Sequence, residues 1–171
     1  MRDALGLSHF QEGSLTTGFS IAGTIASLVA GVLATRYGTR LVIGVSAISG
    51  GIALILLGTS PSFIFALVMS AVVGLSLAGL GTPAMGLLVA WFDATTRGKA
   101  AGIAAGGSGF SFIIIGALVP WLIGLNQEDG WRHVWYTLGI ITMALGIVSL
   151  TLLRKKQRRR RAVVEAGPWM S

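Results

Sequence analysis

Charge and cysteine are the scarcest features of this 171-residue sequence. Asp, Glu, Lys and Arg make up 11% of the residues, whereas a soluble globular domain usually carries about a quarter. The low charge therefore excludes an ordinary soluble domain. The absence of cysteine excludes disulfide bonds, so the redox compartment cannot be inferred. The first 13 residues lack the basic-then-apolar order of a signal peptide, so we expect no cleaved segment.

Apolar residues are abundant instead, at 53% of the chain with a mean hydropathy of +0.79. Five runs have about the 20 mostly apolar residues that a membrane helix needs, and none contains a charged side chain. Only helices and closed barrels satisfy the backbone in lipid, and no run alternates polar and apolar residues as a barrel strand would. We predict an all-α polytopic membrane helix bundle over residues 1–153, with helices over about 15–34, 41–58, 63–91, 100–125 and 134–153.

Basic residues divide the connections into two sets. Eleven of the 13 Lys and Arg residues fall in one set, at Arg36, Arg40, Arg97, Lys99 and the run 154–161. Only Arg2 and Arg132 fall in the other set. The positive-inside rule places the arginine-rich side in the cytoplasm. We therefore expect a protein of the plasma (inner) membrane whose basic tail, residues 154–171, is cytoplasmic.

The same topology puts Met1 outside, with no earlier helix to translocate the first one. The opening segment "MRDALGLSHFQEGSLTTGF" reads like an outer loop that feeds a helix. We expect that a first membrane helix is missing from this chain.

Three segments carry a family resemblance, in the right order and topology. Residues 31–40, "GVLATRYGTR", are similar to a hairpin motif G-x-x-x-D-R/K-x-G-R/K-R/K, matched at Gly31, Arg36, Gly38 and Arg40. Residues 91–111, "WFDATTRGKAAGIAAGGSGFS", resemble a loop and fifth helix, and 130–140, "GWRHVWYTLGI", resemble the start of a sixth. The family is the major facilitator superfamily, in its monocarboxylate or oxalate–formate-like branch. The resemblance implies helices two to six of a twelve-helix fold, an incomplete amino-terminal half.

Physical reasons accompany the hairpin residues. Gly38 can turn the chain with a positive φ, and Gly31 lets another helix approach. Arg36 and Arg40 anchor the loop at the headgroup level. The resemblance implies a latch between the two halves through an aspartate, but Thr35 stands there, so we expect a weaker or different latch. The alternative is that these arginines serve only as topology signals.

Small residues form stripes on two of the predicted helices. Gly102, Gly106, Gly109 and Gly116 fall on one face of the fourth helix. On the first helix, Ser20, Thr24, Ser27 and Gly31 recur at helical spacing. Small residues let helix backbones meet closely in lipid. The resemblance implies an interface with the opposite half of the molecule, and static packing within this half is the alternative.

The third predicted helix matches the family's central fourth helix, which lines the transport cavity. Its possible cavity-lining residues are Ser70, Ser76, Thr82 and Met85. Packing hydroxyls are the more frequent role of such serines and threonines. No predicted span contains an Asp, Glu, His, Lys or Arg, so we expect any coupling residue in the missing parts.

Two other function classes fail. The sequence "GGSG" at 106–109 fits an intramembrane serine protease, but Ser108 would lie about 24 Å below the level of His133 at about 1.5 Å per residue. The net charge of +7 would suit nucleic acid. However, seven of the basic residues lie in the run 154–161, where they would attract anionic lipid. We expect no enzyme, cofactor, metal or nucleic-acid partner.

The preferred interpretation is transport of a small solute by alternating access, as part of a major facilitator transporter. An organic anion such as a monocarboxylate is the expected solute, on resemblance alone. Partners would be the solute, the lipid bilayer, a missing first helix and a carboxy-terminal half. The alternative is a non-transporting membrane protein that acts through helix association with a partner.

The charge asymmetry generates a first prediction, on topology. Single cysteines at Thr39 and Thr96 should react with a thiol reagent from the cytoplasmic side only, because both positions lie in arginine-rich connections. A cysteine at Gln127 should react with an impermeant reagent added to intact cells. Labelling of Thr39→Cys from outside would overturn the orientation.

Overall fold

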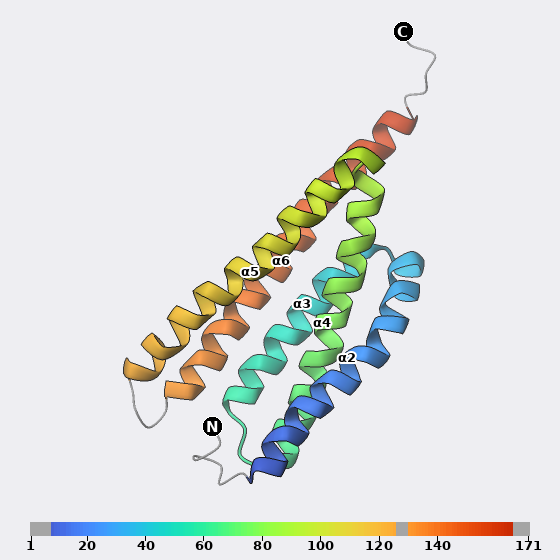
Figure 1. Ribbon diagram of the computed structural model, residues 1–171. Helices are drawn as coiled ribbons and strands as arrows, with labels where there is room; N and C mark the ends of the chain where they lie inside the picture. The colour runs from blue at the N-terminus through green and yellow to red at the C-terminus, as the bar shows by residue number, and fades with distance from the viewer. Residues whose placement is uncertain (1–7, 126–129, 166–171) are drawn as a thin grey trace.

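The computed structural model describes residues 8–125 and 130–165, and nearly all of them are helical (Figure 1). Five helices are long and apolar enough to cross a membrane in this part of the chain. The predicted all-α membrane bundle is therefore confirmed. The helices are α2 (His9–Tyr37), α3 (Thr39–Gly58), α4 (Phe63–Trp91), α5 (Ala94–Leu125) and α6 (Gly130–Glu165).

Four helices extend beyond the bounds expected from hydropathy, α3 by only two residues at its start. α2 begins at His9 rather than near residue 15, because Ser8 and Gln11 form a capping box: the Ser8 hydroxyl accepts from the Gln11 amide at 3.2 Å, and the Gln11 side chain accepts from the Ser8 amide at 2.9 Å. α5 begins at Ala94 and includes charged residues that a hydrophobic run omits. α6 continues to Glu165, so the basic run 154–161 is helical and continuous with the last membrane helix.

The connections between α2 and α3, α3 and α4, and α4 and α5 are short. Gly38 alone separates α2 from α3, with φ at +89°, a value that side chains other than glycine rarely adopt. The positive φ expected at this glycine is confirmed. α3 ends at Gly58, where the amide of Thr59 donates to the carbonyl oxygen of Leu56 at 3.1 Å. Pro61 follows before α4 begins at Phe63.

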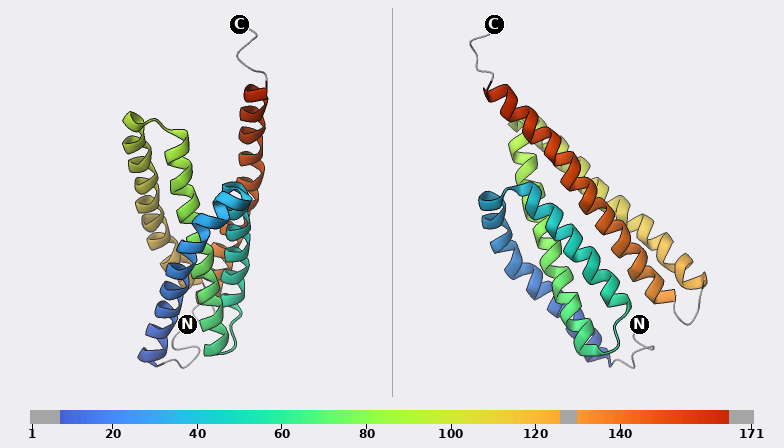
Figure 2. Two further views of the ribbon diagram at one scale, coloured as in Figure 1. Left: turned by 90° about the vertical axis from the view of Figure 1, so that its right-hand side faces the viewer. Right: turned by 180° about the vertical axis from the view of Figure 1, so that it is seen from behind.

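The helices pack in pairs. α2 lies along α4, α4 also contacts α3, and α3 lies along α6 (Figures 1 and 2). α5 has few contacts by comparison, mainly with α6. Seven of the 20 residues of α3 are buried, whereas none of residues 94–124 of α5 is. The fold therefore has a packed part, α2, α3, α4 and α6, and one helix with an open surface.

Glycine lines the contact between α3 and α6. A methyl group added to Gly51 would lie 2.7 Å from the carbonyl oxygen of Gly139, and one added to Gly139 would lie 2.7 Å from the carbonyl oxygen of Gly51. Gly146 packs in the same way on Ala47 and Ile48. Lipid provides no hydrophobic drive between helices, so close van der Waals contact of this kind must hold them together.

A second glycine pair joins α2 and α4. A methyl group on Gly23 would lie 3.2 Å from the carbonyl oxygen of Gly74, and one on Gly74 would collide with the carbonyl oxygen of Phe19. The buried apolar residues are correspondingly small, with alanines at positions 30, 47, 53 and 66. Large apolar side chains such as Leu28 and Ile113 are exposed on the outer surface of the bundle.

Two arginines hold α3 and α6 together near opposite ends of their contact. Arg40, in the first turn of α3, donates from Nε to the carbonyl oxygen of Leu150 at 2.7 Å. Arg132, in the first turn of α6, donates from Nη1 to the carbonyl oxygen of Gly58 at 2.9 Å. The carbonyl of Gly58 ends α3, where the helix dipole is negative and carbonyls lack helical partners. Each guanidinium therefore links the start of one helix to a carbonyl of the other.

The glycine contacts generate a second prediction. Gly51→Leu should lower the free energy of unfolding by about 1–3 kcal/mol, because the new side chain has no space beside α6. Unfolding by a denaturing detergent, followed by tryptophan fluorescence, measures this change.

Gly106→Leu is the matched control, because nothing lies within 4 Å of a methyl group added there. The control should unfold like the parent chain. Equal destabilisation by the two substitutions would show that the α3–α6 contact is not specially close.

Candidate functional site

Most residues of the hairpin motif belong to the end of α2 or the start of α3. The hydroxyl of Thr35 donates to the carbonyl oxygen of Val32 at 2.8 Å, inside its own helix. The guanidinium of Arg36 lies over the ring of Tyr37, 5.8 Å from its centroid. Gly31 faces α4: a methyl group there would lie 3.9 Å from the Cγ2 atom of Thr82. Of the hairpin motif, Gly31 is thus brought close to Thr82 of the candidate cavity set.

The predicted glycine stripe on α5 meets nothing within the described chain. No atom lies within 4 Å of a methyl group built at Gly102, Gly106, Gly109 or Gly116. Static packing of this stripe inside the chain is therefore not observed. Its role as an interface with a separate part stays a prediction.

A groove lies between α2 and α4, which we call the α2–α4 groove. It has a volume of about 640 Å³, and no charged side chain of the described residues lines it. Its lining includes Ser20, Thr24, Ser27, Thr82 and Met85. The hydroxyls of Thr24 and Ser27 donate to carbonyl oxygens of their own helix, at 2.9 and 2.7 Å, and their oxygen atoms can still accept hydrogen bonds. The groove can offer several hydroxyl groups to a polar ligand.

The four possible cavity-lining residues of α4 divide among three places. Thr82 and Met85 line the α2–α4 groove. Ser76 is buried, 5% exposed, and its hydroxyl lies 3.1 Å from that of Ser49 on α3 and 2.9 Å from the carbonyl oxygen of Val72. Ser76 therefore contributes to packing between α3 and α4. Ser70 lines a different cavity.

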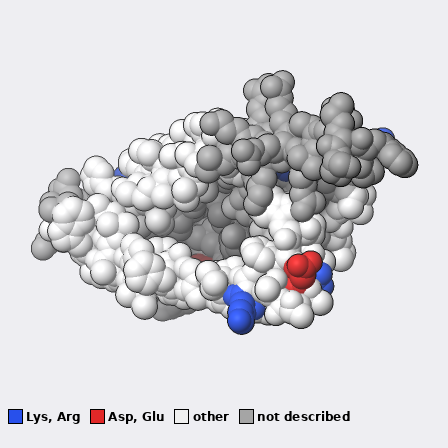
Figure 3. All heavy atoms as spheres, turned by 90° about the horizontal axis from the view of Figure 1, so that it is seen from above, with Lys and Arg blue, Asp and Glu red and all other residues white. Residues whose placement is uncertain are grey.

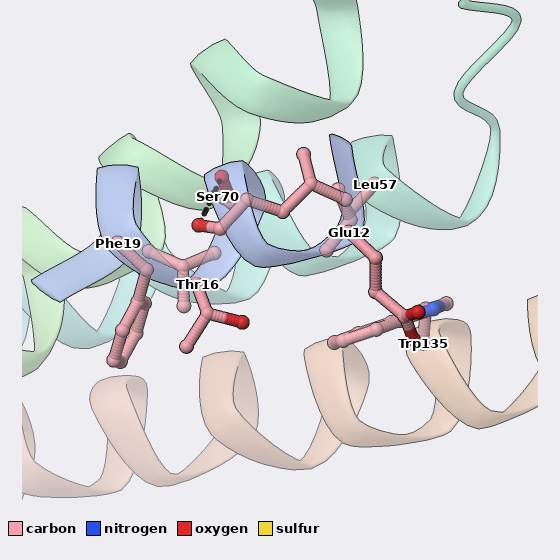
Figure 4. A pocket seen from close by; sticks show the side chains of 8 residues that line it. Glu12, Thr16, Phe19, Leu57, Ser70 and Trp135 are labelled. Carbon is pink, nitrogen blue, oxygen red and sulfur yellow. Dashed lines mark hydrogen bonds between the residues drawn. The ribbon is translucent and has the colours of Figure 1, made fainter. Parts of the chain in front are cut away.

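That second cavity, which we call the Glu12 cavity, lies between α2, α3, α4 and α6 and holds about 300 Å³. Figure 4 shows the side chain of Glu12 extending from α2 toward Trp135 of α6. Ser70 lies across from them, its hydroxyl donating to the carbonyl oxygen of Leu67 at 2.8 Å and lying 3.4 Å from that of Leu15. The rest of the wall is mostly apolar.

Sequence reasoning missed Glu12 as a cavity residue. It assigned Glu12 to an outer loop, because the hydrophobic run begins only at Leu15. The available signal was the pair Ser8 and Gln11, whose spacing is that of a capping box and extends the helix past Glu12.

Among the described side chains, few Lys, Arg, Asp and Glu lie on the face of the molecule at which α6 ends; the side chains of the basic run 154–161 are outside the described set. Figure 3 shows this face, with a hollow between the helices; Lys, Arg and acidic side chains lie together at one edge, and further Lys or Arg atoms are visible at other points. In the first turn of α5, Arg97 donates from Nη2 to the carbonyl oxygen of Val89 at 3.1 Å. This arginine thus links the start of α5 to the end of α4.

Comparisons with known proteins place this arrangement in context. The family model described as Major Facilitator Superfamily matches residues 1–169. The chain is 27% identical over 165 residues to a probable L-galactonate transporter of Escherichia coli, covering 96% of this chain and 36% of the relative. It is 30% identical over 155 residues to the probable galactarate/D-glucarate transporter GudP of Bacillus subtilis, covering 85% and 33%.

A third relative is the probable sulfoacetate transporter SauU of Cupriavidus necator. The identity is 25% over 145 residues, which is 84% of this chain and 33% of the relative. The chain therefore spans about a third of the length of the curated relatives that it matches.

The α2–α4 groove generates a third prediction. Because the sequence has no native cysteine, a single Thr24→Cys substitution gives one reactive thiol. In lipid nanodiscs this thiol should react with a charged, impermeant methanethiosulfonate, since the groove is open along one side and its hydroxyl groups can hold water.

Val29→Cys is the control, because Val29 is a large apolar side chain that is 51% exposed on α2 and does not line the groove. In lipid it should react at least tenfold more slowly. Equal rates at the two positions would mean that the groove is not a water-filled surface.

Proposed function

The chain belongs to the Major Facilitator Superfamily, and from this membership we propose that it is part of a transporter that moves a small organic anion across a membrane. Five helices of this chain are long and apolar enough to span the bilayer, so it is an integral membrane protein. Transport would proceed by alternating access, in which one group of helices rocks against another around a site near the middle of the bilayer.

The class of solute is supported by the relatives. Their names refer to L-galactonate, galactarate, D-glucarate and sulfoacetate, all of which are organic acids. Monocarboxylates such as galactonate belong to this class. We propose the class for this chain and extend it to no single compound.

The observation that carries the proposal is the α2–α4 groove. Its hydroxyl groups from Ser20, Thr24 and Thr82 suit a solute with several hydroxyls and oxygens. A bound anion also needs a positive charge, and no Lys or Arg lines the groove in the described residues. We propose that this charge comes from outside the five helices.

The open surface of α5 supports the proposed partners. α4 packs on both α2 and α3, whereas α5 rests mainly on α6 and has none of its apolar window buried. We propose that a first helix and a carboxy-terminal half pack on α5, where the open glycine stripe would let backbones approach.

We also propose an orientation in the membrane and the absence of enzymatic activity. The basic side would face the cytoplasm from the plasma membrane, with the run 154–161 near anionic lipid. The relatives are named as transporters, and we propose that this chain has no enzymatic activity: the hydroxyl of Ser108 donates within its own helix, to the carbonyl oxygen of Ala104 at 3.3 Å. The alternative, a non-transporting protein that acts by helix association, shares the open α5 surface. Uptake measurements separate the two.

The fourth prediction tests transport. The 171-residue chain alone in liposomes should give no saturable uptake of D-glucarate or lactate, because α5 and the α2–α4 groove lack an opposing surface. A chimera in which this chain replaces the matching third of the Bacillus subtilis galactarate/D-glucarate transporter should take up D-glucarate with saturation.

The same chimera with Thr24→Val should show an apparent KM about three- to tenfold higher, the cost of one hydrogen bond. Val29→Ile, outside the groove, should leave the KM unchanged. Saturable uptake by the chain alone would contradict the proposed partners. An inserted chimera without uptake would contradict the transport proposal.

A further inference from the structure

The Glu12 cavity differs from the α2–α4 groove in charge. Of its lining residues only Glu12 is ionisable, and no Lys, Arg or His of the described residues lines it. The walls are formed by apolar and aromatic side chains, including Leu15, Phe19 and Trp135 (Figure 4). The chemistry of this cavity is that of one carboxylate above an apolar surface.

The carboxylate of Glu12 has no hydrogen-bond or ion-pair partner among the described residues. The hydroxyl of Ser70 is already donated to backbone carbonyls. Thr16 lies one turn after Glu12, on the same face of α2 and in the same cavity wall. Its hydroxyl and the carboxylate can therefore meet one ligand together.

No charged group of residues 8–125 or 130–151 lines the cavity beside this carboxylate. On α6, the guanidinium of Arg132 donates to Gly58 and lies over the ring of Trp131, 4.6 Å from its centroid. The ring of His133 packs edge-on against Tyr136, with 6.4 Å between centroids. α3 and α4 contribute no charged residue to the wall. His9, on α2 itself, lies one turn before Glu12 and is not part of the lining.

We propose that the Glu12 cavity binds a small organic cation, of the alkylammonium class. The carboxylate would attract the positive charge, and the indole face of Trp135 would add a cation–π interaction. The apolar side chains would contact the alkyl groups. A volume of about 300 Å³ accommodates a quaternary ammonium ion with short substituents.

The same features argue against other ligands. An organic anion would meet the charge of Glu12 with no compensating cation in the lining. A hard inorganic cation takes six or more oxygen ligands or keeps its waters. The lining supplies one carboxylate and two hydroxyls, one of which is engaged with the backbone. This site is therefore separate from the proposed path of an organic anion.

The test uses the full 171-residue chain in maltoside micelles, with choline as the probe and 3,3-dimethyl-1-butanol as its uncharged isostere. Tryptophan is replaced by 5-fluorotryptophan, and the fluorine signal of Trp135 is assigned with Trp135→Phe. Choline should shift this signal with saturation, and the isostere should bind at least tenfold more weakly.

Glu12→Gln should weaken choline binding at least tenfold, and Asp93→Asn, in the α4–α5 connection away from the cavity, should leave it unchanged. Glu12 is exposed and makes no side-chain bond in the described part of the chain, so the variant should fold, as circular dichroism and gel filtration check. Equal binding of choline and its isostere, equal loss in both variants, or displacement of choline by sodium at equal concentration would overturn the proposal. The isostere comparison needs no substitution, so it decides the matter even for a variant that misfolds.

Discussion

The fold depends on the close approach of helix backbones at glycine. Gly51 of α3 meets Gly139 of α6, and Gly23 of α2 meets Gly74 of α4, with no space for even one methyl group. In water, burial of apolar side chains would join such helices, but in lipid the surroundings are as apolar as the side chains. Contact between backbones, together with the guanidinium of Arg132 on the carbonyl of Gly58, replaces that drive. The other arrangements, including both cavities, follow from which helices have such contacts.

α5 lacks contacts of this kind, and this difference connects the fold to the proposed function. The two glycine-joined pairs form a continuous unit through the contact of α3 with α4. Both the α2–α4 groove and the Glu12 cavity are built on this unit, so their walls are held by its packing. α5 presents small residues to nothing within the described chain. In the function proposed above, a neighbour would slide or rock on this surface, as alternating access requires.

Much of the fold could be predicted from the sequence. Hydropathy located the five membrane helices. The turn at Gly38 could be predicted because glycine is the residue that most easily adopts a positive φ. The helix ends could not be read from hydropathy, because capping by Ser8 and Gln11 is a polar signal. As a result Glu12 was left outside the helix and outside the candidate sites.

The pairing of glycines was also beyond single-sequence reasoning. Glycine is spread over every helix, and the stripe from Gly102 to Gly116 is the most regular, yet it meets nothing within the described residues. Gly51 and Gly139 are less conspicuous, and their contact depends on how α3 and α6 cross. The crossing of helices also decides which hydroxyl groups line a cavity. Ser76 packs on Ser49, whereas Thr82, six residues later, lines the groove.

The central claim is that glycine contacts hold α3 to α6 while α5 is left open for another partner. Pulsed electron–electron double resonance, which measures the distance between two spin labels, tests this claim most directly on the chain alone in nanodiscs. Spin labels at Val45 of α3 and Ile147 of α6 face outward and avoid the glycine contacts, as does a label at Ile113 of α5. The account predicts a narrow distance distribution for Val45 with Ile147 and a broad one for Ile113 with Ile147. Equally narrow distributions for the two pairs would contradict it.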